Sequence, residues 1–132
     1  MQKGKIAFFD SGIGGLTVLR SCLERLDGYI YYYYGDNARA PYGNLSKENI
    51  RRYVLEAFDC FCDLGVDGAV VACNTATAVC MEELRERYAF PIVGTEPAIY
   101  PAAAMGGEVL VLATRATVVR ERINRQIGRA HV

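Results

Sequence analysis

The sequence lacks both an excess of charge and long apolar runs. Lys plus Arg and Asp plus Glu each number 15 among the 132 residues, so no basic field is available to attract nucleic acid. No apolar run approaches the ~18 residues that a membrane-spanning helix needs. We therefore expect neither nucleic acid nor a membrane among its partners, and the hydrophobic share of 52% is that of an ordinary globular protein.

An export signal is lacking as well. The basic start "MQKGKIAFFD" has an apolar part that runs only from Ile6 to Phe9, which is too short for a signal-peptide core and suits a first strand. We therefore expect a cytoplasmic protein. The chain has five cysteines, an odd number, and their spacing is not that of a disulfide framework, so we expect no disulfides. We expect Cys60 and Cys62 to be buried apolar side chains rather than zinc ligands.

Histidine is almost absent, which limits the chemistry. The single histidine, His131, lies in the last six residues, "IGRAHV" (127–132). A DNA sequence that resembles a sequencing-library adapter would encode these six residues. We expect this tail to be non-native and His131 to have no catalytic role. Without a histidine base, hydrolysis through a thioester is not supported, and ligands for a catalytic metal are lacking too.

What the sequence does contain is an alternation of short apolar runs and amphipathic stretches. The apolar runs predict strands at 5–10, 29–36, 67–73, 90–95 and 108–114. The stretches between them predict helices at 16–26, 47–65, 75–88, 98–105 and from 115 onward. Strands separated by helices of this length predict an α/β fold, with a parallel sheet flanked by helices.

Polar residues stand where these strands end. The carboxyl ends of parallel strands lie at one edge of the sheet, and ligands bind at that edge in such folds, so we expect these residues to form the site. They are Asp10, Ser11, Asp36 (which follows Gly35), Cys73, Asn74, Thr75, Thr95, Glu96 and Thr114.

Cys73 has the most informative position among them. In "VVACNTATAV" (70–79) it ends a strand and comes just before a helix N-terminus, where free amides and the helix dipole favour a thiolate. A thiolate can act as a base in proton transfer, but inversion of a carbon centre also needs a second acid/base group on the opposite face of the substrate. From these residues alone, a buried core thiol stays an alternative for Cys73, and Asn74 and Thr75 could be helix caps only.

The glycine loop "DSGIGGLT" (10–17) offers backbone amides to an anion. Gly12 and Gly14 fit the start of a dinucleotide fingerprint, but its third glycine would fall at Thr17, and no phosphate-loop lysine follows. A carboxylate therefore suits this loop as well as a phosphate does, and a nucleotide is the weaker alternative.

Five segments, taken in this order and spacing, resemble the glutamate racemases of the aspartate/glutamate racemase superfamily. They are "FFDSGIGGLTVL", "YYGDNARAPYGN", "VVACNTATA", "PIVGTEPAI" and "VLATRATV", and the resemblance covers essentially all of residues 4–126. It implies a cofactor-independent racemase with two cysteines, one for each face of the substrate, that supplies D-glutamate for peptidoglycan synthesis. It also implies that the full-length protein is a homodimer.

Cys73 matches the first of the two family cysteines. The second belongs to a Gly-Cys-Thr-His motif in the later half of family members, which this sequence does not contain. The 132-residue chain is therefore expected to be inactive as a racemase on its own. An aspartate or hydantoin racemase of the same superfamily and a non-catalytic small-acid binding module stay open as alternatives.

The resemblance also assigns site residues position by position. Cys73 matches the first catalytic cysteine and Asp10 a catalytic acid that assists proton transfer near the substrate amine, and Glu96 matches an assisting acid. The matches that bind glutamate are Asp10, Ser11, Pro41, Tyr42, Gly43, Asn74, Thr75, Thr114 and Thr117. No metal and no cofactor is implied.

The expected domain organisation follows from the same resemblance, because family members clasp the substrate between two similar α/β domains. Residues 1–97 correspond to the first domain without its C-terminal return, residues 98–126 to the start of the second, and residues 127–132 to the non-native tail. The fold is thus expected to be truncated before the second domain is complete.

Overall fold

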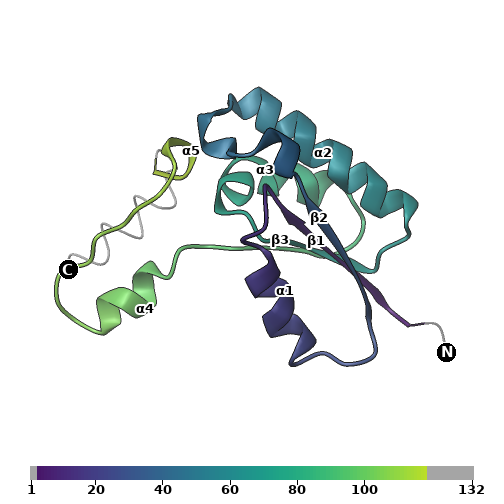
Figure 1. Cartoon of the computed structure of the whole chain (residues 1–132), viewed down its shortest axis with the longest axis horizontal. Helices are drawn as coiled ribbons and strands as arrows, with labels where there is room; N and C mark the ends of the chain where they lie inside the picture. Colours follow the sequence, from purple (N-terminus) through teal and green to yellow (C-terminus); the bar gives the residue numbers. More distant parts are fainter. Residues whose placement is uncertain (1–2, 119–132) are drawn as a thin grey trace.

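The computed structural model describes residues 3–118 and has three layers. A four-stranded sheet lies between α1 (Leu16–Leu23) on one side and α2 (Lys47–Asp63) with α3 (Asn74–Arg87) on the other (Figure 1). The predicted tail at 127–132, with His131, and the part of the second predicted domain beyond residue 118 lie outside the described residues.

The sheet is parallel, with the strand order β2-β1-β3-β4. In the central strand, Phe9 pairs with Tyr34 on one side and with Val71 on the other, and Asp10 pairs with Gly35 at the carboxyl end. The predicted α/β fold is confirmed, and each observed strand falls within its predicted range: β1 (Lys5–Asp10), β2 (Ile30–Gly35), β3 (Gly68–Val71) and β4 (Ile92–Gly94).

The main apolar core lies between the sheet and the α2/α3 layer. Ser46 caps α2, because its side chain accepts a hydrogen bond from the backbone N–H of Asn49 at 3.2 Å. The helix then turns one apolar face toward Phe9 of the sheet, whereas Leu64 lies beyond the helix end and is 40% exposed. The buried residues of α2 are Ile50, Val54, Leu55, Ala57, Phe58 and Phe61.

The cysteines of α2 do not belong to this core, so their predicted burial is wrong. Cys60 and Cys62 are both exposed, on either side of the buried Phe61. Since successive helical residues are rotated by about 100°, the two neighbours of a core residue turn outward. All five cysteines fall within the described residues, and all are free thiols.

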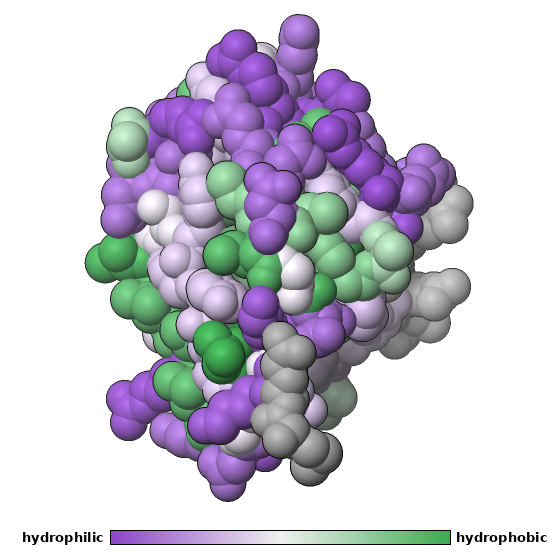
Figure 2. All heavy atoms as spheres, turned by 90° about the vertical axis from the view of Figure 1, so that its right-hand side faces the viewer, coloured by the Kyte–Doolittle hydropathy of each residue, from purple (hydrophilic) through white to green (hydrophobic). Residues whose placement is uncertain are grey.

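The opposite face of the sheet keeps more of its apolar surface exposed. The helix predicted at 16–26 ends at Leu23, because Arg25 and Leu26 both donate to the carbonyl of Cys22 and close the last turn. Leu16, Leu23 and Leu26 remain 45%, 49% and 43% exposed. Figure 2, which looks onto the right-hand side of Figure 1, shows apolar surface in the middle of that view, with polar surface above and below.

Residues 98–118 contribute no strand to the sheet. They form α4 (Ile99–Ala104), which lies apart from the sheet in Figure 1, and α5 (Arg115–Val118). The predicted strand at 108–114 is wrong, and Leu110 and Leu112 within it are 83% and 87% exposed. A strand needs a neighbour for its backbone N–H and C=O groups, and in the part of the chain that the structure describes no strand pairs with this segment.

Candidate active site

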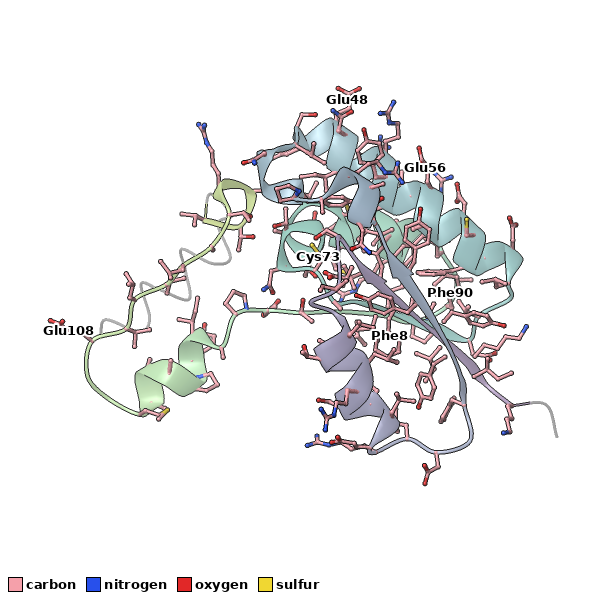
Figure 3. All side chains as sticks on the ribbon, viewed as in Figure 1. Phe8, Glu48, Glu56, Cys73, Phe90 and Glu108 are labelled. Carbon is pink, nitrogen blue, oxygen red and sulfur yellow. The ribbon has the colours of Figure 1, made fainter. Side chains whose placement is uncertain are left out.

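Cys73 caps the N-terminus of α3, which confirms its predicted position between a strand and a helix. Its backbone is extended, and its sulfur accepts a hydrogen bond from the backbone N–H of Ala76 at 3.4 Å. The thiol also donates to the hydroxyl of Ser11 at 3.5 Å, and the residue is 7% exposed. The sulfur is thus held by a helix-terminal amide on one side and by the Ser11 hydroxyl on the other. In Figure 3 Cys73 lies where the sheet meets α3, whereas Glu48 and Glu56 point away on the outer side of α2.

Asp10 ends β1 and holds the glycine loop. Its Oδ2 accepts hydrogen bonds from the backbone N–H groups of Gly12 at 3.2 Å and Gly15 at 3.0 Å. A Cβ added at Gly15 would lie 2.8 Å from the Cβ of Asp10, so this close approach needs a glycine. These two amides, which the sequence suggested as donors to a bound anion, are thus occupied by the chain's own carboxylate.

Three threonine hydroxyls connect α3 with α5. Thr75 Oγ1 lies 2.8 Å from Thr114 Oγ1, which in turn lies 3.2 Å from Thr117 Oγ1. Thr75 and Thr117 are 5% and 2% exposed. Residues far apart in the sequence are therefore brought to one side of the site by polar contacts.

These groups surround a cavity of about 360 Å³. The predicted site residues that line it are Asp10, Ser11, Cys73, Asn74, Thr75, Thr114 and Thr117. Apolar parts of the lining come from Ala72, Pro97, Leu112 and Ala113, which the sequence did not single out. A carboxylate, a thiol, hydroxyls and an amide thus face a volume suited to a small polar molecule.

The predicted loop residues Pro41, Tyr42 and Gly43 are not among the residues that line this cavity. Gly43 contacts the site through Thr114, because a Cβ added at Gly43 would lie 2.8 Å from Thr114 Cγ2. Tyr42 is buried, and its hydroxyl donates to Asp36. Burial first, and then that hydrogen bond, raise the pKa of Tyr42 well above its ordinary value. Glu96, the predicted assisting acid, is not among the lining residues either.

Two further side chains near the site were not predicted. Arg39 forms ion pairs with Asp36 at 2.8 Å and with Glu56 at 2.7 Å, and its guanidinium lies over the ring of Tyr53, so it holds the 36–43 loop against α2. Tyr33 of β2 donates from its hydroxyl to the carbonyl of Gly12 at 2.8 Å. The signal for Tyr33 was its place in the strand, two residues before Gly35, with which Asp10 pairs.

Among residues 3–118, no group of three or more His, Cys, Asp or Glu side chains is arranged to hold a metal ion. The helices within the same described range are all too short or too polar to cross a membrane.

Comparisons with known proteins agree with this fold. The family model described as "Asp/Glu/Hydantoin racemase" matches residues 13–132. A protein named glutamate racemase from Halothermothrix orenii is 45% identical over 127 residues, which are 95% of this chain and 50% of that protein.

Solved structures give the same result. The glutamate racemase from Aquifex pyrophilus superposes with a TM-score of 0.84 at 41% identity, over 96% of this chain and 51% of that one. The Escherichia coli glutamate racemase in complex with L-glutamate and the activator UDP-MurNAc-Ala superposes with a TM-score of 0.82 at 40% identity, over 97% of this chain and 49% of that one. The chain therefore spans about half the length of the relatives that it matches.

Proposed function

Because this chain belongs to the Asp/Glu/Hydantoin racemase family, we propose that its site serves the interconversion of L- and D-glutamate by a cofactor-independent, two-cysteine mechanism. The observation that carries the proposal is the thiol of Cys73, which caps α3 beside a cavity that Asp10 and several hydroxyls also line. Glutamate is preferred to aspartate or a hydantoin because the relatives described above are named glutamate racemases.

In this proposal the Cys73 thiolate removes the proton from the α-carbon of glutamate, and the electron pair of the broken C–H bond stays on that carbon. A second thiol on the opposite face then delivers a proton, which inverts the centre. Cys73 is the single cysteine among the described residues that line the cavity. The 132-residue chain is therefore expected not to invert glutamate on its own.

The other cavity residues hold the substrate. Asp10 is the carboxylate among them, and it faces the substrate ammonium and assists proton transfer near it. Ser11, Asn74 and Thr75 donate to a carboxylate beside the helix N-terminus. Thr114 and Thr117 contact the side-chain carboxylate, Pro41, Tyr42 and Gly43 form the neighbouring loop, and Glu96 acts as an assisting acid.

The wider setting is part of the same proposal. D-glutamate made by the full-length protein feeds peptidoglycan synthesis in the cytoplasm, and that protein is a homodimer. Residues 1–97 belong to its first α/β domain and residues 98–126 to the start of the second.

The proposal can be tested on the 132-residue chain through protection of Cys73 from iodoacetamide. In a background with Cys22, Cys60 and Cys62 changed to Ser, the remaining thiols are Cys73 and Cys80. Burial raises the pKa of Cys80 to about 12, so Cys80 reacts little near neutral pH. L-glutamate is expected to slow alkylation of Cys73 several-fold, while L-lysine, which lacks a second carboxylate, does not.

Equal slowing by L-lysine, or none by L-glutamate, would contradict the proposed site. Stronger protection by L-aspartate would move the substrate to aspartate. Incubation of the same chain with L-glutamate, followed by chiral chromatography, is expected to give no D-glutamate, and formation of D-glutamate would contradict the need for a second thiol.

A further inference from the structure

Tyr33 lies behind the site rather than in it. It pairs with Phe8 in the sheet register, and its side chain is half-buried. Its hydroxyl donates to the carbonyl oxygen of Gly12 at 2.8 Å, and it would lie 3.1 Å from a Cβ added at Gly15. The hydroxyl thus contacts the glycine loop, while Tyr33 is not among the residues that line the cavity.

The loop is held at Gly12 from two directions. The N–H of Gly12 donates to Asp10, while its carbonyl accepts from Tyr33. A Cβ added at Gly35 would lie 2.6 Å from that same carbonyl oxygen, so the strand leaves no free space on that side. Ser11 stands between Asp10 and Gly12, and its hydroxyl is the one that contacts the Cys73 thiol.

We propose that Tyr33 is a positioning residue of this site: by holding the Gly12 carbonyl it keeps the Ser11 hydroxyl beside Cys73. When the thiol is ionised, Ser11 becomes the donor and stabilises the thiolate. The inference deepens the proposed function, on which it rests, because it assigns a residue that sets the state of the proposed base.

Tyr33 is suited to this positioning role because its hydroxyl keeps its proton over the pH range in which a thiol ionises. Burial first, and then the charge and hydrogen bonding of Asp10, raise the pKa of Tyr33 to about 12. Free cysteine thiols titrate near pH 8.5, so the tyrosine hydroxyl keeps its proton throughout that range.

The test is the pH profile of Cys73 alkylation without any ligand, in the background that keeps only Cys73 and Cys80. Tyr33→Phe keeps the ring and removes the donor. We expect the midpoint of the rate profile to rise by about half a pH unit or more, because the thiolate loses a hydrogen bond. Tyr31→Phe is the matched control, since Tyr31 lies on the same strand and donates to the carbonyl of Leu26 at 2.5 Å, away from the site. It is expected to leave the midpoint unchanged.

Two further variants show whether Tyr33 acts through Ser11. Ser11→Ala is expected to give the same rise, and the double variant Ser11→Ala/Tyr33→Phe no additional rise. Gly35→Ala, which pushes on the Gly12 carbonyl without removing Tyr33, is expected to raise the midpoint too, and it supplies the test if Tyr33→Phe does not fold.

An unchanged midpoint in a folded Tyr33→Phe chain would overturn the inference, as would an equal rise in Tyr31→Phe or additive rises in the double variant. These outcomes are independent of glutamate. The midpoint could shift as expected in a chain in which glutamate does not protect Cys73 from alkylation. That result would keep the positioning role of Tyr33 and contradict the proposed function.

Discussion

Residues 5–95 and residues 98–118 contain similar apolar segments but bury them very differently. In the first region, Phe8 and Phe58 are fully buried, in layers on the two faces of the sheet. In the second, Met105, Leu110 and Leu112 are 88%, 83% and 87% exposed. The difference shows that an apolar pattern sets a preference, while burial depends on a partner element being present.

The site depends on both regions nevertheless. Thr75 of the first region is hydrogen-bonded to Thr114 of the second, and Gly43 packs against the same threonine. The well-packed region supplies Cys73 and Asp10, and the less packed one supplies Thr114, Thr117 and Leu112 to the same cavity. A substitution in residues 98–118 can therefore change the geometry of the site while it changes the stability of the core little.

The largest expected effect comes from the core of the first region. Phe58 contacts the rings of Phe61, Tyr88 and Phe90 at centroid distances of 5.2, 5.5 and 6.3 Å. Phe58→Ala should lower the free energy of unfolding by about 3–5 kcal/mol, because it leaves a cavity in a packed core. Leu112→Ala is the counterpart in the second region and should change the free energy of unfolding by less than about 0.5 kcal/mol.

Urea denaturation followed by circular dichroism measures both variants. Similar losses for the two would mean that residues 98–118 contribute to the cooperative core as much as the sheet does, and the contrast between the regions would then be wrong.

A second, intermediate effect is expected at alkaline pH. Tyr42 is 2% exposed, and burial followed by its hydrogen bond to Asp36 raises its pKa above the ordinary value of about 10. The unfolded chain therefore loses this proton first, so the stabilisation is complete below about pH 10 and is lost as the pH rises further. Tyr33 adds a loss of the same sign between about pH 10 and about 12.

The melting temperature measured from pH 9 to pH 12 tests this. It should fall steeply above pH 10, and less steeply in Tyr42→Phe, which is less stable at pH 7 because Asp36 loses a hydrogen bond. Tyr100→Phe in α4, where the tyrosine is 44% exposed, should leave the slope unchanged. Equal slopes for the wild-type chain and Tyr42→Phe would show that Tyr42 does not carry the effect.

Local patterns were enough to predict most of the first region. Short apolar runs separated by helical spacing gave the strands, because both periods follow directly from backbone geometry. The position of Cys73 before a helix was predictable for the same reason, since a strand end and a helix start are both local signals. The edge of the sheet at which these ends meet then followed from parallel pairing.

Contacts between distant segments were not predictable in this way. The sequence could not show that the amides of Gly12 and Gly15 bind Asp10, because that depends on how the loop folds back. Nor could it show that residues 108–114 have no neighbouring strand among the described residues, since the partner of a strand is not encoded within it. Exposure of Cys60 and Cys62 was predictable from the helical period around Phe61 and was missed.

The smallest expected effect concerns the link between the regions. Thr75→Val keeps the side-chain shape and removes the hydrogen bond to Thr114, while Thr114 keeps its contact with Thr117. The free energy that holds α5 in place should therefore fall by only about 1 kcal/mol. That corresponds to a roughly five-fold faster hydrogen exchange of the Thr117 and Val118 amides, which donate to the Thr114 carbonyl. Thr17→Val in α1 also removes a hydroxyl bond, to the carbonyl of Gly14, and should leave these amides unchanged. If Thr75→Val leaves them unchanged too, the contact of Thr114 with Gly43, and not the hydroxyl pair, holds α5 in place.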